Sequence, residues 1–180
     1  PPVLTDTTPS YLKFLNVDPL RSAVRSGNTK MRVGVIGTGI ACDLPTFLGK
    51  VNREASRSFV DNHPCLDNDG HETLGTSVID TVVGGGVEFV SLKTITPLPI
   101  GKNGELQLFS TLDGLLAAFY EVANWKESAV VNASIVFPES RLLWEAIKAL
   151  QNRVFVAMAA GNDGKAIVSC PACYAYDVPH

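Results

Sequence analysis

The stretch Met31-Arg-Val-Gly-Val-Ile-Gly37 is a short, mostly apolar and β-branched run that ends in glycine. Such a run is typical of a strand that is buried on both faces of a parallel sheet. Three further runs of the same kind follow at residues 87–95, 129–136 and 154–160. Four buried strands of this kind favour a parallel sheet as the centre of the fold.

Amphipathic patterns lie between these runs and predict helices. The first helical face consists of Leu112, Leu115, Leu116, Phe119 and Val122, and the second of Leu142, Leu143, Ala146, Ile147 and Leu150. Strands that alternate with helices indicate right-handed βαβ crossovers. The sequence therefore predicts an α/β fold with a doubly wound parallel sheet over residues 31–180, preceded by an N-terminal arm over residues 1–30. Ligands of such sheets bind at the carboxyl ends of the strands.

Composition excludes several classes of function. The 180 residues suit a single domain, and a content of 46% hydrophobic and 18% charged residues is globular. The net charge is −3, and the 15 lysines and arginines are scattered. Because polyphosphates and anionic lipids require clustered positive charge, we expect no nucleic-acid or membrane partner. The chain also has no apolar run near the ~20 residues that cross a bilayer, and its first residues do not resemble a signal peptide.

The four cysteines are too few for a disulfide scaffold, which favours buried free thiols and a reducing compartment such as the cytoplasm. Cys170-Pro-Ala-Cys173 has the C-x-x-C spacing of redox and metal sites. No second pair of metal ligands has a recognisable spacing. Cys42 and Cys65 would complete a metal site only if the fold happened to bring them beside Cys170 and Cys173. The acidic loop at residues 61–71 resembles a calcium loop in composition alone. No metal is therefore expected.

The turn Val33-Gly-Val-Ile-Gly-Thr-Gly39 raises a second possibility, because glycines after a strand also occur in dinucleotide-binding folds. The third small position of that motif falls on Cys42, and Pro45 stands where the following helix should continue. An NAD(P)-dependent oxidoreductase is thus the less favoured interpretation, and we expect no cofactor.

Five blocks, taken together, resemble the subtilisin-like serine proteases, or subtilases. They are Gly37-Thr-Gly-Ile40, Asp69-Gly-His-Glu-Thr73, Val131-Asn-Ala-Ser-Ile135, Ala159-Ala-Gly-Asn-Asp-Gly164 and Cys170-Pro-Ala-Cys-Tyr174. The corresponding family blocks are Asp-Thr-Gly-Ile, Gly-His-Gly-Thr-His, Ile-Asn-Met-Ser-Leu-Gly, Ala-Ala-Gly-Asn-Glu-Gly and Tyr-Pro-Ala-x-Tyr, the last with a cis bond before its proline. The resemblance implies a subtilisin-like fold that lacks the C-terminal third.

The resemblance also implies which parts of a serine hydrolase site are present. Such a site needs a hydroxyl nucleophile, an imidazole base, a carboxylate that orients it and donors for the oxyanion. His71 matches the base, Asn162 matches the oxyanion position, and Gly37 replaces the family's aspartate. Only eighteen residues follow Asn162, so the nucleophilic serine is expected to be absent. The tripeptide at residues 75–77, Gly-Thr-Ser, is interpreted as a coincidence within the helix that His71 begins.

Two further departures concern the surroundings of the site. Glu72 replaces the glycine after the histidine and is expected to crowd the turn, and Leu74 replaces the family's second histidine. The resemblance assigns substrate binding to the strand end Ser134, Ile135 and Val136, where a valine stands in place of glycine. That branched side chain argues against the ordinary docking of a peptide.

The preferred hypothesis is a degenerate subtilisin-like domain that is inactive as a protease and acts by binding or assembly. Without the serine-bearing helix an apolar strip would stay exposed, and such a strip is typical of an interface. The expected partner is another protein or a second copy, with a peptide or small molecule in the cleft as a further option. The alternative is a serine endopeptidase or a repurposed enzyme that uses His71 and Asn162 with a nucleophile from another segment.

Overall fold

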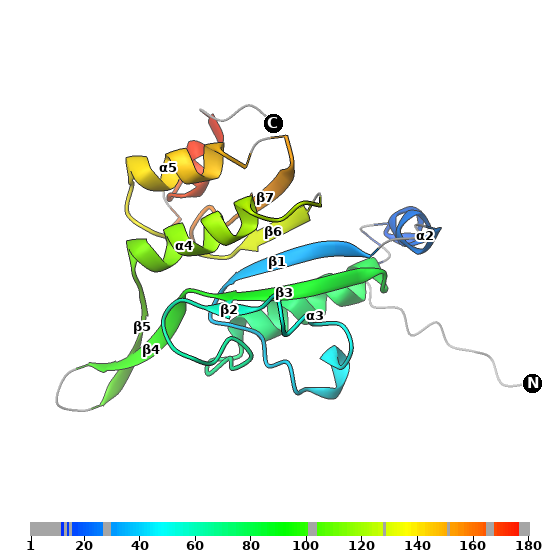
Figure 1. Ribbon diagram of the computed structural model, residues 1–180, viewed down its shortest axis with the longest axis horizontal. Coiled ribbons are helices and arrows are strands. Elements are labelled where there is room, and N and C mark those ends of the chain that lie inside the picture. The colour runs from blue at the N-terminus through cyan, green and yellow to red at the C-terminus, as the bar shows by residue number, and fades with distance from the viewer. Residues whose placement is uncertain are drawn as a thin grey trace, which may run out of the picture.

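A computed structural model describes residues 12, 14, 16–26, 30–100, 104–127, 129–150, 152–164 and 168–176. A parallel sheet lies at its centre, with the strands in the order β2-β3-β1-β6-β7 (Figure 1). The strands are β1 (Met31–Gly37), β2 (Arg57–Ser58), β3 (Val87–Lys93), β6 (Ala129–Ala133) and β7 (Val154–Met158). The predicted doubly wound α/β fold is confirmed.

Helices cover both faces of this sheet. The described helices are α2 (Asp18–Ser26), α3 (His71–Val83), α4 (Leu112–Ala123) and α5 (Arg141–Lys148), with short 3-10 helices η1 (Pro45–Phe47) and η2 (Ala172–Tyr176). Helices α4 and α5 lie on one face, and α3 lies on the other. None of these described helices is long and apolar enough to span a membrane.

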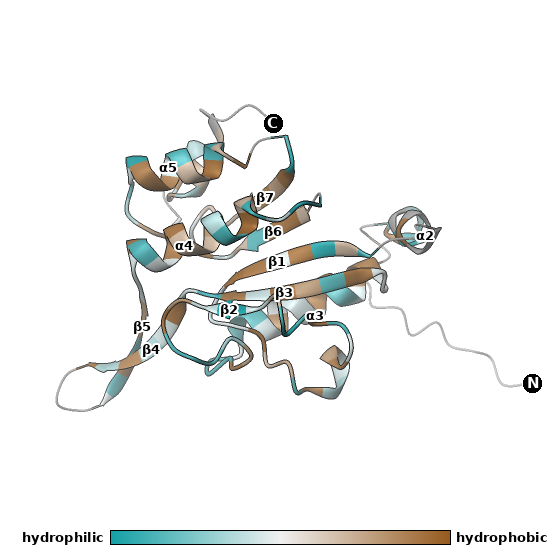
Figure 2. Cartoon of the chain, in the orientation of Figure 1, coloured by the Kyte–Doolittle hydropathy of each residue, from teal (hydrophilic) through white to brown (hydrophobic). Residues whose placement is uncertain are grey.

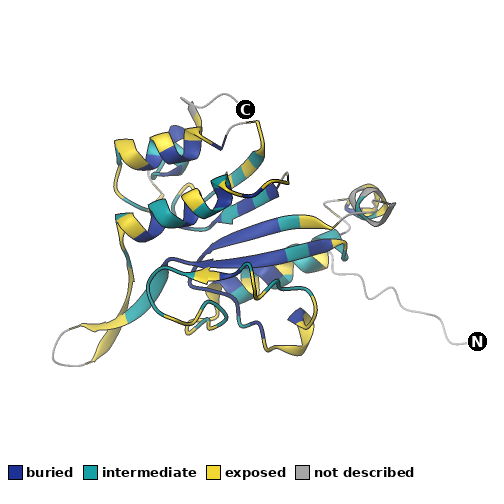
Figure 3. Cartoon of the chain, in the orientation of Figure 1, coloured by how far each residue is buried: buried dark blue, intermediate teal, exposed yellow. Residues whose placement is uncertain are grey.

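Strand β1 explains why both faces are apolar. Val33 and Val35 are buried in the core under α3, whereas Ile36 is buried in the core under α4 and α5. Alternate residues of a strand project to opposite faces, so one continuous apolar run supplies both cores. Hydrophobic colour accordingly runs along the central strands in Figure 2, and the same strands are the most deeply buried in Figure 3.

The helices α4 and α5 begin where side chains can cap them. The side chain of Thr111 accepts a hydrogen bond from the Gly114 amide, and that of Ser140 accepts one from the Leu143 amide. Such caps satisfy amide groups that a helix leaves without partners at its N-terminus. The second predicted helical face extended to Leu150, whereas α5 ends at Lys148 in the structure.

An antiparallel hairpin of β4 (Ile95–Ile100) and β5 (Glu105–Ser110) is an element that no sequence pattern predicted. It projects from the body of the domain between β3 and α4. The expected N-terminal arm lies largely outside the described residues. Its described helix α2 contacts α3, because Arg21 donates hydrogen bonds to the backbone carbonyls of Thr81 and Val82.

All four cysteines are paired, which corrects the expectation of free buried thiols. Cys42 is bonded to Cys65, and Cys170 to Cys173. Because disulfides persist mainly in oxidising surroundings, the cysteines no longer favour a reducing compartment such as the cytoplasm. The bond from Cys170 to Pro171 is cis, as the resemblance implied.

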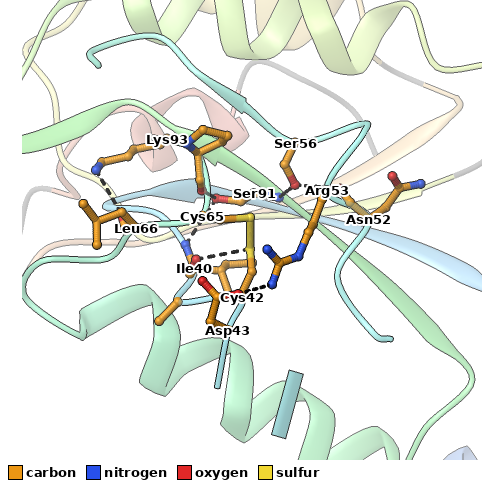
Figure 4. The surroundings of a disulfide bond; sticks show 12 residues. Ile40, Cys42, Asp43, Asn52, Arg53, Ser56, Cys65, Leu66, Ser91 and Lys93 are labelled. Atoms are coloured by element: carbon orange, nitrogen blue, oxygen red, sulfur yellow. Dashed lines mark hydrogen bonds and ion pairs between the residues drawn. A yellow bond between two sulfur atoms is a disulfide. The ribbon is translucent and has the colours of Figure 1, made fainter. Parts of the chain in front are cut away.

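The Cys42–Cys65 disulfide ties the loop after β1 to the loop that leads into α3 (Figure 4). We expect the Cys42→Ser/Cys65→Ser variant to lose about 3 kcal/mol in free energy of unfolding, because the bond closes a loop across 23 positions. Urea denaturation measures this loss. The Cys170→Ser/Cys173→Ser variant is the control, since its bond spans three positions and should contribute much less. Equal losses in the two variants would contradict the loop-closure explanation.

Candidate functional site

The predicted site residues occupy the carboxyl edge of the sheet. Strand β1 ends at Gly37 and β6 ends just before Ser134, while Asn162 follows β7 in an exposed turn. The carboxyl ends of parallel strands meet at one edge, which is where ligands of such sheets bind. In the strand order β1-β6-β7, Asn162 lies two strands away from Gly37.

The structure brings Gly37, His71 and Glu72 into contact. The Glu72 side chain is only 1% exposed, and its Oε1 lies 3.3 Å from Nδ1 of His71. A β carbon built on Gly37 would lie 2.1 Å from that same Oε1. The expected crowding of the turn by Glu72 is therefore not seen, because the side chain folds into the space that Gly37 leaves empty.

His71 is placed by a helix N-terminus that aspartates cap. Asp69 accepts a hydrogen bond from the His71 amide at 3.0 Å, and Asp67 accepts one from the Thr73 amide at 2.8 Å. Gly70 precedes the helix with φ of 78°, a left-handed conformation that suits glycine. The His71 side chain itself is 62% exposed. One nitrogen of the ring thus meets a buried carboxyl group while most of the ring remains accessible.

Burial raises the pKa of Glu72 to about 7, because the buried site disfavours the charged form. The neighbouring His71 charge lowers this pKa, and the negative charges of Asp67 and Asp69 raise it further. Burial also raises the pKa of Asp67, but its hydrogen bonds with Thr73, Asp69 and Thr38 together leave this pKa below its ordinary value. Asp67, with a lowered pKa, thus lies near a carboxyl group whose pKa is close to neutrality.

A buried lysine that the sequence analysis missed supports the edge of this site. Lys93 ends β3, pairs with Gly37 in the sheet register and is completely buried. Its Nζ lies 2.8 Å from the Leu66 carbonyl and 2.7 Å from the Asp61 carboxylate. These bonds attach the loop before α3 to the sheet, and Figure 4 shows the one to Leu66. The sequence signal that could have identified Lys93 is a single lysine at the end of an otherwise mostly apolar run.

The predicted substrate strand lies at the end of β6. Ile135 is buried, Ser134 is half-buried, and Val136 is 56% exposed. The side-chain amide of Asn132 in β6 donates to the Ser134 hydroxyl at 2.8 Å. Beyond this strand lies an open pocket of about 390 Å³ that the sequence analysis did not foresee, lined by Glu139, Ser140, Arg141, Trp144 and Tyr174.

The glycine turn after β1 differs from a dinucleotide-binding turn. In that motif the glycines open directly into a helix whose N-terminus holds the pyrophosphate. Here Gly37 leads into a loop with the short helix Pro45–Phe47, and the helix α3 begins only at His71. Within the described ranges, no group of three or more His, Cys, Asp or Glu side chains could hold a metal ion.

The comparisons with known proteins concern the fold. No family model and no curated protein matches the chain. A cold-adapted subtilisin-like serine proteinase matches with a TM-score of 0.59 and 26% identity, over 74% of this chain and 47% of that chain. A psychrophilic protease named S41 matches with a TM-score of 0.59 and 18% identity, over 85% and 55%. A lanthipeptide protease matches with a TM-score of 0.53 and 20% identity, over 73% and 39%.

The chain therefore has a subtilisin-like fold, and it spans about half the length of these solved structures. The family resemblance that the five sequence blocks indicated is confirmed at the level of the fold.

The first prediction from this site concerns the buried ion pair. We expect Asp61→Asn to cost about 3 kcal/mol in free energy of unfolding, because it leaves Lys93 buried without its counter-charge. Lys93→Met, which removes the buried charge, should cost less. Urea denaturation of the two variants provides the measurement. A smaller loss in Asp61→Asn than in Lys93→Met would show that the pair does not hold the loop electrostatically.

The second prediction concerns pH. The folded-state pKa of Glu72, about 7, lies above its ordinary value of 4.5, so the protonated carboxyl favours folding below 4.5 and this contribution disappears as the pH rises through 7. Between pH 5 and pH 8.5 the wild type should lose about 2.5 kcal/mol of unfolding free energy relative to Glu72→Gln. Urea denaturation at both pH values tests this, and parallel pH profiles for the two proteins would contradict it.

Proposed function

We propose that this subtilisin-like domain acts as one part of an assembly and is completed by a helix that packs beside α3. The open half of one sheet face is the observation that carries the proposal. A sheet in a doubly wound fold is stable when helices cover both of its faces, because each face is apolar. A helix supplied by another polypeptide segment would meet that requirement on this side.

The register identifies the open half. In a parallel sheet, paired residues of neighbouring strands project to the same face. Val33 of β1 pairs with Phe89 of β3 on one side and with Val130 of β6 on the other, and Val130 pairs with Phe155 of β7. Val33 and Phe89 are buried, Val130 is half-buried, and Phe155 is 61% exposed.

Burial on this face therefore decreases from β1 towards β7. The strand residues of the core under α3 come from β1 and β3, so α3 covers that half of the face. Helix α3 also carries two exposed apolar side chains one turn apart, Leu74 at 68% and Val78 at 46%. Packed helices lie about 8–10 Å apart, so a second helix beside α3 would lie over β6 and β7. Contiguous apolar surface of this kind is typical of a protein interface.

Binding and assembly are thus the proposed role. Two features support a role without ordinary proteolysis: position 37 lacks the family's aspartate, and Val136 is exposed in the segment that the resemblance assigns to substrate binding. A hydrolase is the second candidate, and the contact of His71 with a buried carboxyl group favours it. Because His71 begins α3, a helix beside α3 could carry a nucleophile to the exposed imidazole. Asn162 would then supply the oxyanion donor.

The proposal predicts that apolar surface is available around Phe155. We expect the wild type to bind 8-anilinonaphthalene-1-sulfonate or to associate reversibly with itself, and Phe155→Ser to reduce that signal by more than half. Dye fluorescence and sedimentation equilibrium provide the measurements. Leu142→Ser is the matched control, because Leu142 on α5 is also 61% exposed. Equal reduction in both variants, or a monomer that binds no dye, would contradict the proposal.

The two candidates are separated by a fluorophosphonate probe applied to the chain together with any segment that binds it. Labelling of a serine that His71→Ala abolishes would establish the hydrolase. Binding that depends on Phe155 without any labelling would leave assembly as the function.

A further inference from the structure

We propose that Glu72 replaces the carboxylate that position 37 lacks, and acts as the positioning residue that fixes the tautomer of His71. The two departures from the family pattern, Gly37 for aspartate and Glu72 for glycine, would then be a single exchange that moves the acid from the sheet to the helix. For its catalytic consequence this inference rests on the hydrolase candidate above, whereas the arrangement itself can be tested without any partner.

The space around Gly37 supports the exchange. A β carbon at this position would lie 2.1, 2.5 and 2.6 Å from Oε1, Cδ and Cγ of Glu72. All three distances are shorter than any normal contact, so a side chain at position 37 and the present conformation of Glu72 exclude each other. Since the carboxyl carbon of an aspartate lies about 1.5 Å beyond its β carbon, the Glu72 carboxyl occupies the region into which an aspartate at position 37 would extend.

The direction of the Glu72 side chain supports a role towards His71. Its Oε1 lies 3.3 Å from Nδ1, the nitrogen whose hydrogen bond decides which tautomer is present. An ionised Glu72 accepts the Nδ1 proton in a hydrogen bond, which leaves Nε2 with its lone pair and able to act as a base. A protonated Glu72 can instead donate to Nδ1, so that the ring proton stays on Nε2. The second form carries one more proton than the first, so the pH decides between them.

This alternative makes the pair sensitive to pH near neutrality. Burial raises the pKa of Glu72 to about 7, and the groups that modify this value are His71 on the same helix and Asp67 and Asp69 in the preceding loop. Lys93, from the neighbouring strand, is engaged by Asp61 and the Leu66 carbonyl. We therefore expect the base-competent form of His71 to become dominant as the pH rises through 7.

A purely structural role for Glu72 would not explain why position 72 carries a carboxyl group. Burial of a carboxyl group costs free energy unless hydrogen bonds or charges compensate it. A leucine at position 72 would fill the space above Gly37 without that cost. The contact with His71 supplies a reason for a carboxyl group at this position.

The exchange is tested by a thermodynamic cycle of Gly37→Asp, Glu72→Gly and the double variant. Gly37→Asp alone should be destabilised, because Glu72 must leave its buried position to make room for the new side chain. The double variant, which restores the family arrangement, should recover most of that loss. Gly75→Asp combined with Glu72→Gly is the control, since a β carbon at Gly75 of α3 contacts nothing within 4 Å. Additive losses for positions 37 and 72 would overturn the exchange.

The positioning role is tested by ¹⁵N NMR of the His71 ring at pH 8.5. The wild type should contain mainly the tautomer protonated at Nδ1. Glu72→Leu should shift the population to the tautomer protonated at Nε2, and the Gly37→Asp/Glu72→Gly variant should restore the wild-type population. A ring protonated mainly at Nε2 in the wild type, or a population that Glu72→Leu leaves unchanged, would overturn the proposal. Because all measurements use the isolated chain, failure of the proposed assembly would leave their outcome unaffected.

Discussion

Burial of β1 on both faces is the constraint on which the other elements of the domain depend. Val33 and Val35 form one core with α3, and Ile36 belongs to the other core with α4 and α5. The strand must therefore lie inside the sheet, with β3 and β6 as neighbours. Gly37, at its carboxyl end, then lies at the edge where α3 begins. Because Gly37 has no side chain, Glu72 can occupy the space beside it.

The candidate site lacks an acid on the sheet but has one on the neighbouring helix. The sheet edge has lost the acid that the family resemblance leads one to expect, yet a carboxyl group still lies beside His71 because the helix supplies it. The same helix forms the border of the half-open face that ends at Phe155. A segment that completed the fold there would approach an imidazole already paired with its carboxyl group. Helix α3 would thus take part in both the assembly and the chemistry.

The parts of the structure that depend on local pattern could be predicted from the sequence. Buried strands such as β1 and the start of α4 after Thr111 follow from apolar periodicity and capping, and the family blocks indicated the fold. Pairings between distant positions could not be predicted. The Cys42–Cys65 disulfide and the contact of Glu72 with Gly37 depend on how the loop before α3 lies on the sheet. Taken separately, Gly37 indicated that an acid was missing, and Glu72 indicated that the turn was crowded. In the structure the Glu72 side chain fills the space that Gly37 leaves.

The Glu72 carboxyl occupies the space above Gly37 and contacts Nδ1 of His71. A crystal structure of the chain at pH 8.5, at a resolution that defines side-chain positions, tests this most directly. We expect a buried Glu72 carboxyl within hydrogen-bond distance of Nδ1, with no other group above Gly37. A Glu72 side chain that points into solvent, with water or another residue in that space, would contradict it.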